Sequence, residues 1–302
     1  MATPQENRRG IAAMMATMAL WCANDTLVKM ATQTWSAGQV MTVRSLFAGI
    51  MALAIVAADG ALGKLRLLAD RHVVIRAAVD TVIAATFITA IAHMPLATIT
   101  VIGQSSPIAM TLLAVLLGLE RVGWRRWAAI VVGFLGVVVV IRPGAAPFDV
   151  YTALALICAL LVCVRDLLTR RISAAVPSVV IALSATVAVG TFGIAWGIAG
   201  ALAGSPWQPL AAREVIILAC AGVLVTIGNY ANVLAYRRAD VAVVMPFRYS
   251  VILWAIVLGY LVFGELPDAT ALVGAALIVA SGVYTIHRER RRAAMDARKA
   301  PG

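Results

Sequence analysis

The chain has 302 residues, of which 62% are hydrophobic and only 13% are charged, and its mean hydropathy is +0.94. This balance excludes an ordinary soluble domain and predicts an all-α protein that crosses the membrane many times. The formal net charge of +11 falls in short segments between apolar runs and in the tail that begins at Arg288, so it favours contact with anionic membrane lipids over nucleic-acid binding.

Apolar runs that are long enough to cross a bilayer recur along the whole sequence. Most of them are apolar on every face, as expected of helices in lipid, so their periodicity does not indicate which face meets a neighbour. Reading the runs between charges and turn residues predicts about ten transmembrane helices, at roughly 11–31, 38–57, 73–92, 97–118, 124–141, 149–168, 178–200, 213–235, 241–263 and 269–286.

Lysine and arginine are distributed unevenly between the two sets of connecting loops. The loops that begin near Lys64, Arg121, Arg170 and Arg237, together with both tails, carry most of these residues, and the opposite loops carry few. An even number of spans places both termini on one side, and the positive-inside rule makes that side the cytoplasm. We therefore expect a multi-pass protein of the cytoplasmic (inner) membrane with cytoplasmic N- and C-termini.

The two halves of the sequence look alike. Gly118-Leu-Glu120 closes the fourth run and Gly264-Glu265 closes the ninth, 265 − 120 = 145 residues later. Because five spans is an odd number, two such copies would cross the membrane in opposite senses, as in many secondary transporters. We expect two inverted five-helix repeats, 11–142 and 149–287, and a basic cytoplasmic tail, 288–302. The alternative is that any two strings of apolar helices look alike.

The first run carries charged residues at a depth where they are costly. Asp25, which follows Asn24, costs roughly 3 kcal/mol at the centre of a span, so such a residue usually faces a bundle interior or a water-filled path. Lys29 lies one turn further, on the same helical face as Trp21 and Asp25. Arg44 lies about two turns into the second run, so topology places it in the outer half with them. A structural alternative is an internal ion pair that only fixes helix packing.

A polar sequence interrupts the fourth run at a similar depth. Gln104-Ser105-Ser106-Pro107 lies inside an otherwise apolar segment. Pro107 removes a helical hydrogen bond and can free backbone carbonyls toward a cavity, although many spans tolerate a proline simply as a kink. We expect Gln104, Ser105 and Pro107 to join the outer polar cluster.

The second half supplies a counterpart in the inner half of the bilayer. Arg165-Asp166, followed by Arg170, repeats the aspartate-then-cation spacing of Asp25 and Lys29, and 166 − 25 = 141 residues separate the two aspartates. The ninth run contains Arg248 and Tyr249, and an offset of 145 residues aligns Tyr249 with Gln104. Asp80 is a further candidate, although an ion pair with Arg76 at i, i+4 explains it equally well.

The sequence contains no convergent set of side chains for catalysis or metal binding. Gly103-Gln-Ser105 begins like a nucleophile elbow, but Pro107 takes the place of the last glycine and no strand precedes it. The histidines His72, His93 and His287 lie at span ends and are too scattered to bind one metal ion. We expect no enzyme activity, no metal and no cofactor.

Several of these features together resemble the drug/metabolite transporter superfamily, in its EamA-domain branch. The resemblance rests on the ten spans, the Gly-x-Glu ends and Pro246-Phe-Arg-Tyr249, and it covers nearly the whole chain. Ala23-Asn-Asp25, Ser106-Pro107 and Trp124-Arg-Arg-Trp127 are similar to S-adenosylmethionine uptake transporters. The segment from Tyr236 to Arg290 resembles bacterial riboflavin transporters, from which Arg248 departs because that group tends to have an acidic residue there.

The resemblance implies a secondary transporter that moves a small organic metabolite across the cytoplasmic membrane by alternating access. We favour an S-adenosylmethionine-like cargo, because the candidate residues combine both charge signs with aromatic rings. Riboflavin, amino-acid or drug transport, in either direction, remains an alternative within the superfamily, and a polytopic membrane enzyme or receptor is the alternative from another class. The candidate substrate-binding or gating residues are Trp21, Asn24, Asp25, Lys29, Arg44, Gln104, Ser105, Pro107, Arg165, Asp166, Arg248 and Tyr249.

Overall fold

All regular elements in the described part of the chain are helices. The computed structural model describes residues 3–116, 124–142, 149–169, 171–173, 175–237 and 241–299. Glu120, which closes the fourth predicted run, and Arg170, which begins a predicted cytoplasmic loop, lie outside these ranges. The absence of strands within the described ranges confirms the predicted all-α class.

The helices follow the predicted apolar runs in chain order. They are α1 (Pro4–Thr32), α2 (Ala37–Ala58), the 3₁₀ helix η1 (Leu62–Ala69), α3 (Arg71–Ile91), α4 (Leu96–Gly103), α5 (Ser106–Leu116), α6 (Trp124–Ile141), α7 (Val150–Thr169), α8 (Ser178–Leu202), α9 (Ala212–Arg237), α10 (Val241–Val244), the 3₁₀ helix η2 (Met245–Tyr249), α11 (Ser250–Phe263) and α12 (Ala269–Lys299).

The lengths and compositions of these helices identify a polytopic membrane protein. Within the described ranges, 9 helical segments are long and apolar enough to span a membrane, and Trp127–Ile141 is a shorter apolar helix. Large apolar side chains such as Leu46, Ile50 and Phe134 are 59–61% exposed. Such exposure suits a surface that faces lipid, where apolar side chains replace the polar surface of a soluble protein.

Two predicted spans are not continuous α-helices. The run expected at 97–118 divides into α4 and α5, and the run expected at 241–263 divides into α10, η2 and α11. Each interruption lies next to a proline, Pro107 in the first case and Pro246 in the second. Proline lacks the N–H that would continue the ladder and is tolerated at the start of a new helix, which explains both restarts.

The chain forms two compact units, and each combines segments from both halves of the sequence. Unit 1 consists of Met1–Ala19, Ala97–Asp149 and Gly228–Gly302, and unit 2 consists of Leu20–Leu96 and Val150–Ile227. The compact units therefore do not coincide with the expected repeats 11–142 and 149–287, which remain a prediction about evolutionary and topological equivalence.

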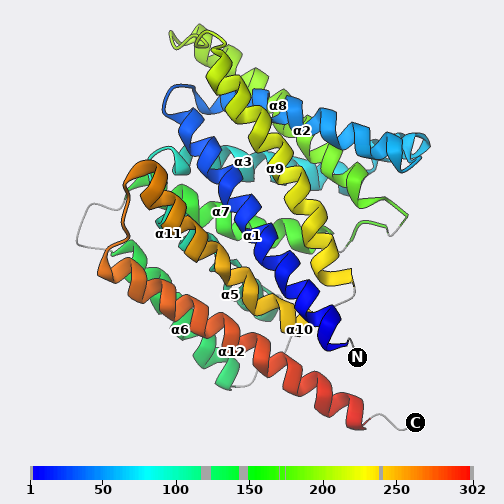
Figure 1. Ribbon diagram of the computed structural model, residues 1–302, viewed down its shortest axis with the longest axis vertical. Coiled ribbons are helices and arrows are strands. Elements are labelled where there is room, and N and C mark those ends of the chain that lie inside the picture. The colour runs from blue at the N-terminus through cyan, green and yellow to red at the C-terminus, as the bar shows by residue number, and fades with distance from the viewer. Residues whose placement is uncertain are drawn as a thin grey trace. The chain divides into compact units, whose positions relative to one another are not determined.

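Small residues allow helices to approach closely within unit 2, where α2 packs on α8 (Figure 1). A Cβ atom at Gly193 would lie 2.9 Å from the Gly38 carbonyl oxygen and 2.7 Å from Thr42 Oγ1. A side chain on Gly193 would therefore push the helices apart, which is the reason for small residues at membrane helix interfaces.

Unit 1 contains a similar small-residue contact between α6 and α12, which run alongside each other (Figure 1). A Cβ atom at Gly136 would lie 2.9 Å from the Gly274 carbonyl oxygen. Nearby, Ser281 Oγ on α12 donates a 2.6 Å hydrogen bond to the Ala129 carbonyl oxygen on α6. A hydrogen bond between close helices adds to van der Waals packing where there is no water to compete for it.

Candidate functional site

Charged side chains of α1 and α2 in unit 2 are joined through an amide. Asn24 and Asp25 lie on α1, and Arg44 reaches them from α2. Arg44 Nε donates to Asn24 Oδ1 at 3.1 Å, and Asn24 Nδ2 donates to Asp25 Oδ1 at 2.8 Å. The sequence predicted that Asp25 and Arg44 would lie near each other, and the structure places Asn24 between them. Asn24 is only 3% exposed, so this bridge is buried.

Lys29 tethers α1 to the turn before α4. Its ammonium Nζ donates a 2.8 Å hydrogen bond to the Met94 carbonyl oxygen, and the residue is 5% exposed. Lys29 thus lies on the helical face predicted from its i+4 spacing, but a principal contact is with the backbone. Trp21, one turn before Asp25, has a buried indole Nε1 with no hydrogen-bond partner within the described ranges.

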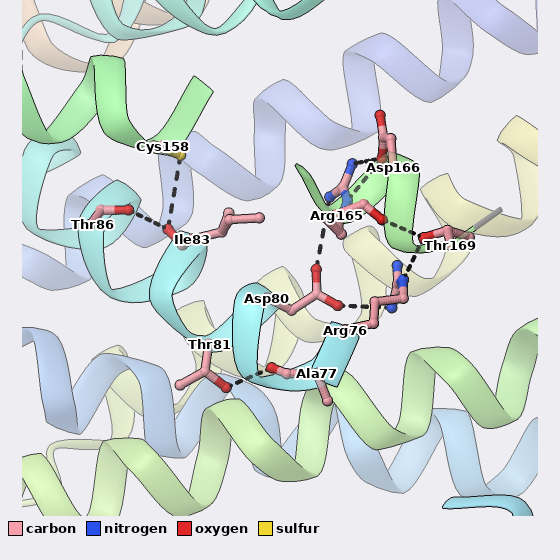
Figure 2. Close-up of polar contacts among 10 residues, drawn as sticks. All are labelled: Arg76, Ala77, Asp80, Thr81, Ile83, Thr86, Cys158, Arg165, Asp166 and Thr169. Carbon is pink, nitrogen blue, oxygen red and sulfur yellow. Dashed lines mark hydrogen bonds and ion pairs between the residues drawn. The ribbon is translucent and has the colours of Figure 1, made fainter. Parts of the chain in front are cut away.

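A charged network joins α3 to α7, also within unit 2 (Figure 2). Arg76 Nη1 pairs with Asp80 Oδ2 at 2.8 Å, which confirms the predicted i, i+4 ion pair. Arg165 Nη1 lies 3.9 Å from Asp80 Oδ1, and Arg165 Nη2 lies 2.7 Å from Asp166 Oδ1. Two arginines and two aspartates balance one another in charge, as charges within a membrane span usually require.

Thr169 completes this network and was missed by the sequence reasoning. Arg76 Nε donates to Thr169 Oγ1 at 2.8 Å, and Thr169 Oγ1 donates to the Arg165 carbonyl oxygen at 2.8 Å. The available signal was the i+4 spacing of Arg165 and Thr169, because a threonine hydroxyl in a helix commonly bonds the carbonyl one turn earlier.

In unit 1, the break between α4 and α5 leaves a polar atom without a partner. Ser105 Oγ donates to the Ile102 carbonyl oxygen at 2.6 Å, so this hydroxyl closes its own turn of helix. Gln104 Oε1 is buried and has no hydrogen-bond partner within the described ranges. Of the predicted residues at this break, Gln104 therefore retains an unsatisfied group, Ser105 is satisfied locally, and Pro107 explains the break itself.

The second interrupted helix of unit 1 has a cluster of unpartnered polar atoms. Tyr249 ends η2 and is 6% exposed. In the described part of the chain, four buried side-chain atoms here have no hydrogen-bond partner: the Tyr249 hydroxyl, Arg248 Nε, Ser250 Oγ and Trp254 Nε1. The sequence reasoning missed Trp254, although its i+4 spacing from Ser250 places both on one face of α11.

Gly282 makes room for the Tyr249 ring. A Cβ atom at position 282 would overlap the Tyr249 hydroxyl and ring carbons. The glycine predicted as part of the tenth span therefore positions Tyr249 against α12.

The predicted site residues divide between the two units. Asn24, Asp25 and Arg44 are brought together in unit 2, whereas Arg165 and Asp166 associate with α3. Arg248 and Tyr249 belong to unit 1, so their predicted association with Arg165 and Asp166 stays a prediction.

Two grooves in the described part of the chain are not lined by any of the candidate site residues. One, with a volume of about 510 Å³, lies between α3 and α8 and is lined mainly by apolar residues such as Val82 and Phe192. The other, about 400 Å³, lies between α6 and α12 beside Trp124 and Tyr284. Exposed apolar walls of this kind suit acyl chains better than a polar metabolite.

A family model matches the first half of the chain. Residues 8–142 match the EamA-like transporter family. This match confirms the resemblance inferred from the spans and motifs.

The curated relatives include transporters of different cargoes. The S-adenosylmethionine uptake transporter of Rickettsia conorii is 25% identical over 197 residues, which are 65% of this chain and 65% of the relative. The riboflavin transporter of Rhizobium johnstonii is 31% identical over 191 residues, 63% of this chain and 61% of the relative. A pseudopaline exporter of Pseudomonas aeruginosa is 26% identical over 200 residues, 63% and 66%. The chain thus spans just under two thirds of the length of these relatives.

A solved structure shares the fold. It superimposes with a TM-score of 0.65 over 93% of this chain and 98% of the other, at 19% sequence identity. This likeness concerns the fold alone.

Proposed function

We propose, from the match of residues 8–142 to the EamA-like transporter family, that the chain is a secondary transporter that moves a small organic metabolite across the cytoplasmic membrane by alternating access. The observation that carries the proposal is the pair of interrupted helices in unit 1. Gln104 at one interruption and Tyr249 at the other are 249 − 104 = 145 residues apart, and each has a buried polar atom without a hydrogen-bond partner among the described residues. Interrupted helices at corresponding positions of two halves are typical of substrate sites in transporters.

Unsatisfied polar atoms support a site rather than a packing contact. A buried hydroxyl or amide without a hydrogen bond costs about 1–3 kcal/mol, and no water is available inside a bilayer to offset this. A polar cargo that bonds to Gln104, Arg248 and Tyr249 would recover that free energy. Binding at these atoms would therefore stabilise the loaded protein relative to the empty one.

The favoured cargo is a metabolite like S-adenosylmethionine, with a flat ring and charged groups. Relatives named for S-adenosylmethionine uptake align with 65% of the chain, and the intramembrane charges Asp25 and Arg44 offer both signs to a charged cargo. Riboflavin is the second candidate. It is favoured by the riboflavin transporter of 31% identity and by the neutral groups of Gln104 and Tyr249, which suit a neutral ring that stacks and hydrogen-bonds.

The direct test is uptake by the purified full-length protein in liposomes. Labelled S-adenosylmethionine, riboflavin, adenosine and methionine are supplied with and without a proton gradient, and protein-free liposomes are the background. We expect saturable accumulation of S-adenosylmethionine that unlabelled S-adenosylmethionine abolishes. If none of these compounds, nor a wider metabolite panel, enters or leaves the liposomes, the transport proposal is wrong.

Tyr249→Phe tests the carrying observation with the smallest possible change. The variant removes only a hydroxyl that has no partner in the described structure, so the thermal midpoint should stay the same or rise. If the hydroxyl bonds to cargo, the apparent affinity should fall about 5- to 10-fold, as expected for one hydrogen bond of about 1–1.5 kcal/mol. Unchanged affinity in a folded variant would remove Tyr249 from the site.

A further inference from the structure

The charges of Asp25 and Arg44 are held close to each other without forming an ion pair. Among the described residues, each of the two side chains bonds to Asn24, Arg44 through Nε and Asp25 through Oδ1. Asn24 can fill this position because its amide has an acceptor and a donor on one planar group. Aspartate and arginine that share a buried environment often pair directly, in a bidentate geometry. The amide spacer prevents that pairing.

Each of the two charged groups has polar atoms that do not bond to the Asn24 amide. Arg44 Nη1, Arg44 Nη2 and Asp25 Oδ2 make no hydrogen bond with the described residues and do not belong to the buried unpartnered atoms. Both residues are half-buried, whereas Asn24 between them is buried. Half-buried opposite charges on either side of a buried spacer form a two-sign surface at the depth of a membrane span.

The neighbouring Lys29 does not neutralise this surface in the way that the sequence suggested. Its ammonium is committed to the Met94 carbonyl oxygen at 2.8 Å. The pair of Asp25 and Arg44 is thus left with one carboxylate edge that accepts and one guanidinium edge that donates. An α-amino acid presents the complementary pattern, because its ammonium donates and its carboxylate accepts on neighbouring atoms.

We propose that Asp25 and Arg44 bind the α-ammonium and the α-carboxylate of a zwitterionic amino-acid cargo, and that Asn24 is the positioning residue that keeps the two charges apart. The inference rests on the proposed transport function and adds to it the recognised chemical group. It predicts that unit 2 binds the amino-acid end of the cargo. An S-adenosylmethionine-like cargo carries this group, and riboflavin does not.

Binding of matched analogues to the purified full-length protein tests the proposal independently of transport. The ligands are S-adenosylmethionine, its decarboxylated analogue, its desamino analogue and riboflavin, and Kd is measured by isothermal titration. In the wild type, removal of either charged group should weaken binding roughly 10- to 100-fold, as expected for one charge-assisted hydrogen-bonded contact. Failure of S-adenosylmethionine to bind, or equal binding of S-adenosylmethionine and its two analogues, would overturn the proposal.

Two variants assign each charge to its partner. Arg44→Gln should bind S-adenosylmethionine and the decarboxylated analogue alike, yet still discriminate against the desamino analogue. Asp25→Asn should bind S-adenosylmethionine and the desamino analogue alike, yet still discriminate against the decarboxylated analogue. A purely structural network predicts that both variants lose affinity for all ligands equally, and this outcome would contradict the proposal. Arg213→Gln is the control, because it removes a guanidinium whose side chain is 70% exposed and which belongs to no candidate site. If Arg248→Gln, and not Arg44→Gln, abolishes the discrimination by carboxylate, the site is wrongly placed.

Asn24→Leu tests the spacer. Without the amide, Arg44 and Asp25 can pair directly. The preference for S-adenosylmethionine over the decarboxylated analogue and over the desamino analogue should therefore weaken together, while the protein stays folded. Asn24→Gln, which keeps an acceptor and a donor, should restore part of the preference over each analogue. Retained discrimination in Asn24→Leu would show that the charges need no spacer. Liposome uptake is measured in parallel: a protein that transports riboflavin but binds no amino-acid ligand refutes this inference and leaves the transport function standing.

Discussion

Asp80 on α3 lies 3.9 Å from Arg165 on α7 through one carboxylate oxygen, while its other oxygen pairs with Arg76 at 2.8 Å. A single carboxylate therefore serves two guanidinium groups and links two helices of unit 2 (Figure 2). The side chains of Asp80 and Arg76 are only 14% and 16% exposed. Because these side chains are so buried, loss of the Asp80 carboxylate leaves the Arg76 guanidinium unpaired with little access to solvent.

Asp80→Asn should therefore destabilise the protein strongly. Removing one partner of a buried ion pair costs about 3–5 kcal/mol, because the remaining charge is uncompensated. The thermal unfolding midpoint of the purified protein in detergent measures the effect. Asp166→Asn is the matched control: the Asp166 side chain is 44% exposed, and an exposed pair contributes only about 0–1 kcal/mol. Equal losses in the two variants would show that α3 and α7 do not depend on the shared carboxylate.

Gly282→Ala should disturb the contact between η2 and α12. The added Cβ would overlap the Tyr249 ring, and overpacking of this kind typically costs about 1–3 kcal/mol. Combining Gly282→Ala with Tyr249→Ala removes the clashing ring, so the double variant should lose less stability than the sum of the two single variants. Gly103→Ala is the control, because a Cβ there meets nothing within 4 Å. Additive losses would mean that the two sites are not in contact.

Asp268 should make a stability contribution that disappears only in strong acid. Its carboxylate precedes α12, accepts the Ala271 N–H at 2.8 Å and pairs with Arg142. The backbone hydrogen bond is the main cause that lowers the pKa of Asp268 below its usual value, with the Thr270 hydroxyl and Arg142 acting in the same direction. Because the folded pKa is depressed, the contribution is complete above the ordinary pKa of about 3.9 and is lost as pH falls through the folded value.

Asp268→Ala should lower stability by about 1 kcal/mol at neutral pH, as expected for loss of a helix N-cap. Thermal midpoints of the wild type and the variant, recorded from pH 7 downward, should stay separated by a constant amount until pH approaches 4. Below that, the two curves should converge. If the two curves converge at pH 6, a group other than Asp268 controls the pH dependence of the stability difference.

Reporter fusions test the predicted topology. Fusions after Arg126, Arg171 and Gly302 should read cytoplasmic, and fusions near Ser36, Ala146 and Pro206 should read external, because basic loops stay on the cytoplasmic side. An external C-terminal tail would contradict both the span count and the inverted repeat.

The sequence by itself determined the features that depend on composition and on helix geometry. The apolar runs established the all-α membrane class, since a bilayer requires such runs whatever their packing. Pro107 indicated the break in the fourth span, because proline lacks an N–H in any context. The Arg76–Asp80 pair followed from i, i+4 spacing, which is the same in every α-helix.

The tertiary structure decided which faces of different helices meet. Most spans are apolar all round, so no periodicity in the sequence indicates that Asn24 separates Asp25 from Arg44. The same holds for Arg165, whose contact with Asp80 depends on how α3 and α7 are rotated against each other. Contacts within a helix are fixed by a backbone geometry that every sequence shares, whereas contacts between helices depend on the packing of all their side chains at once.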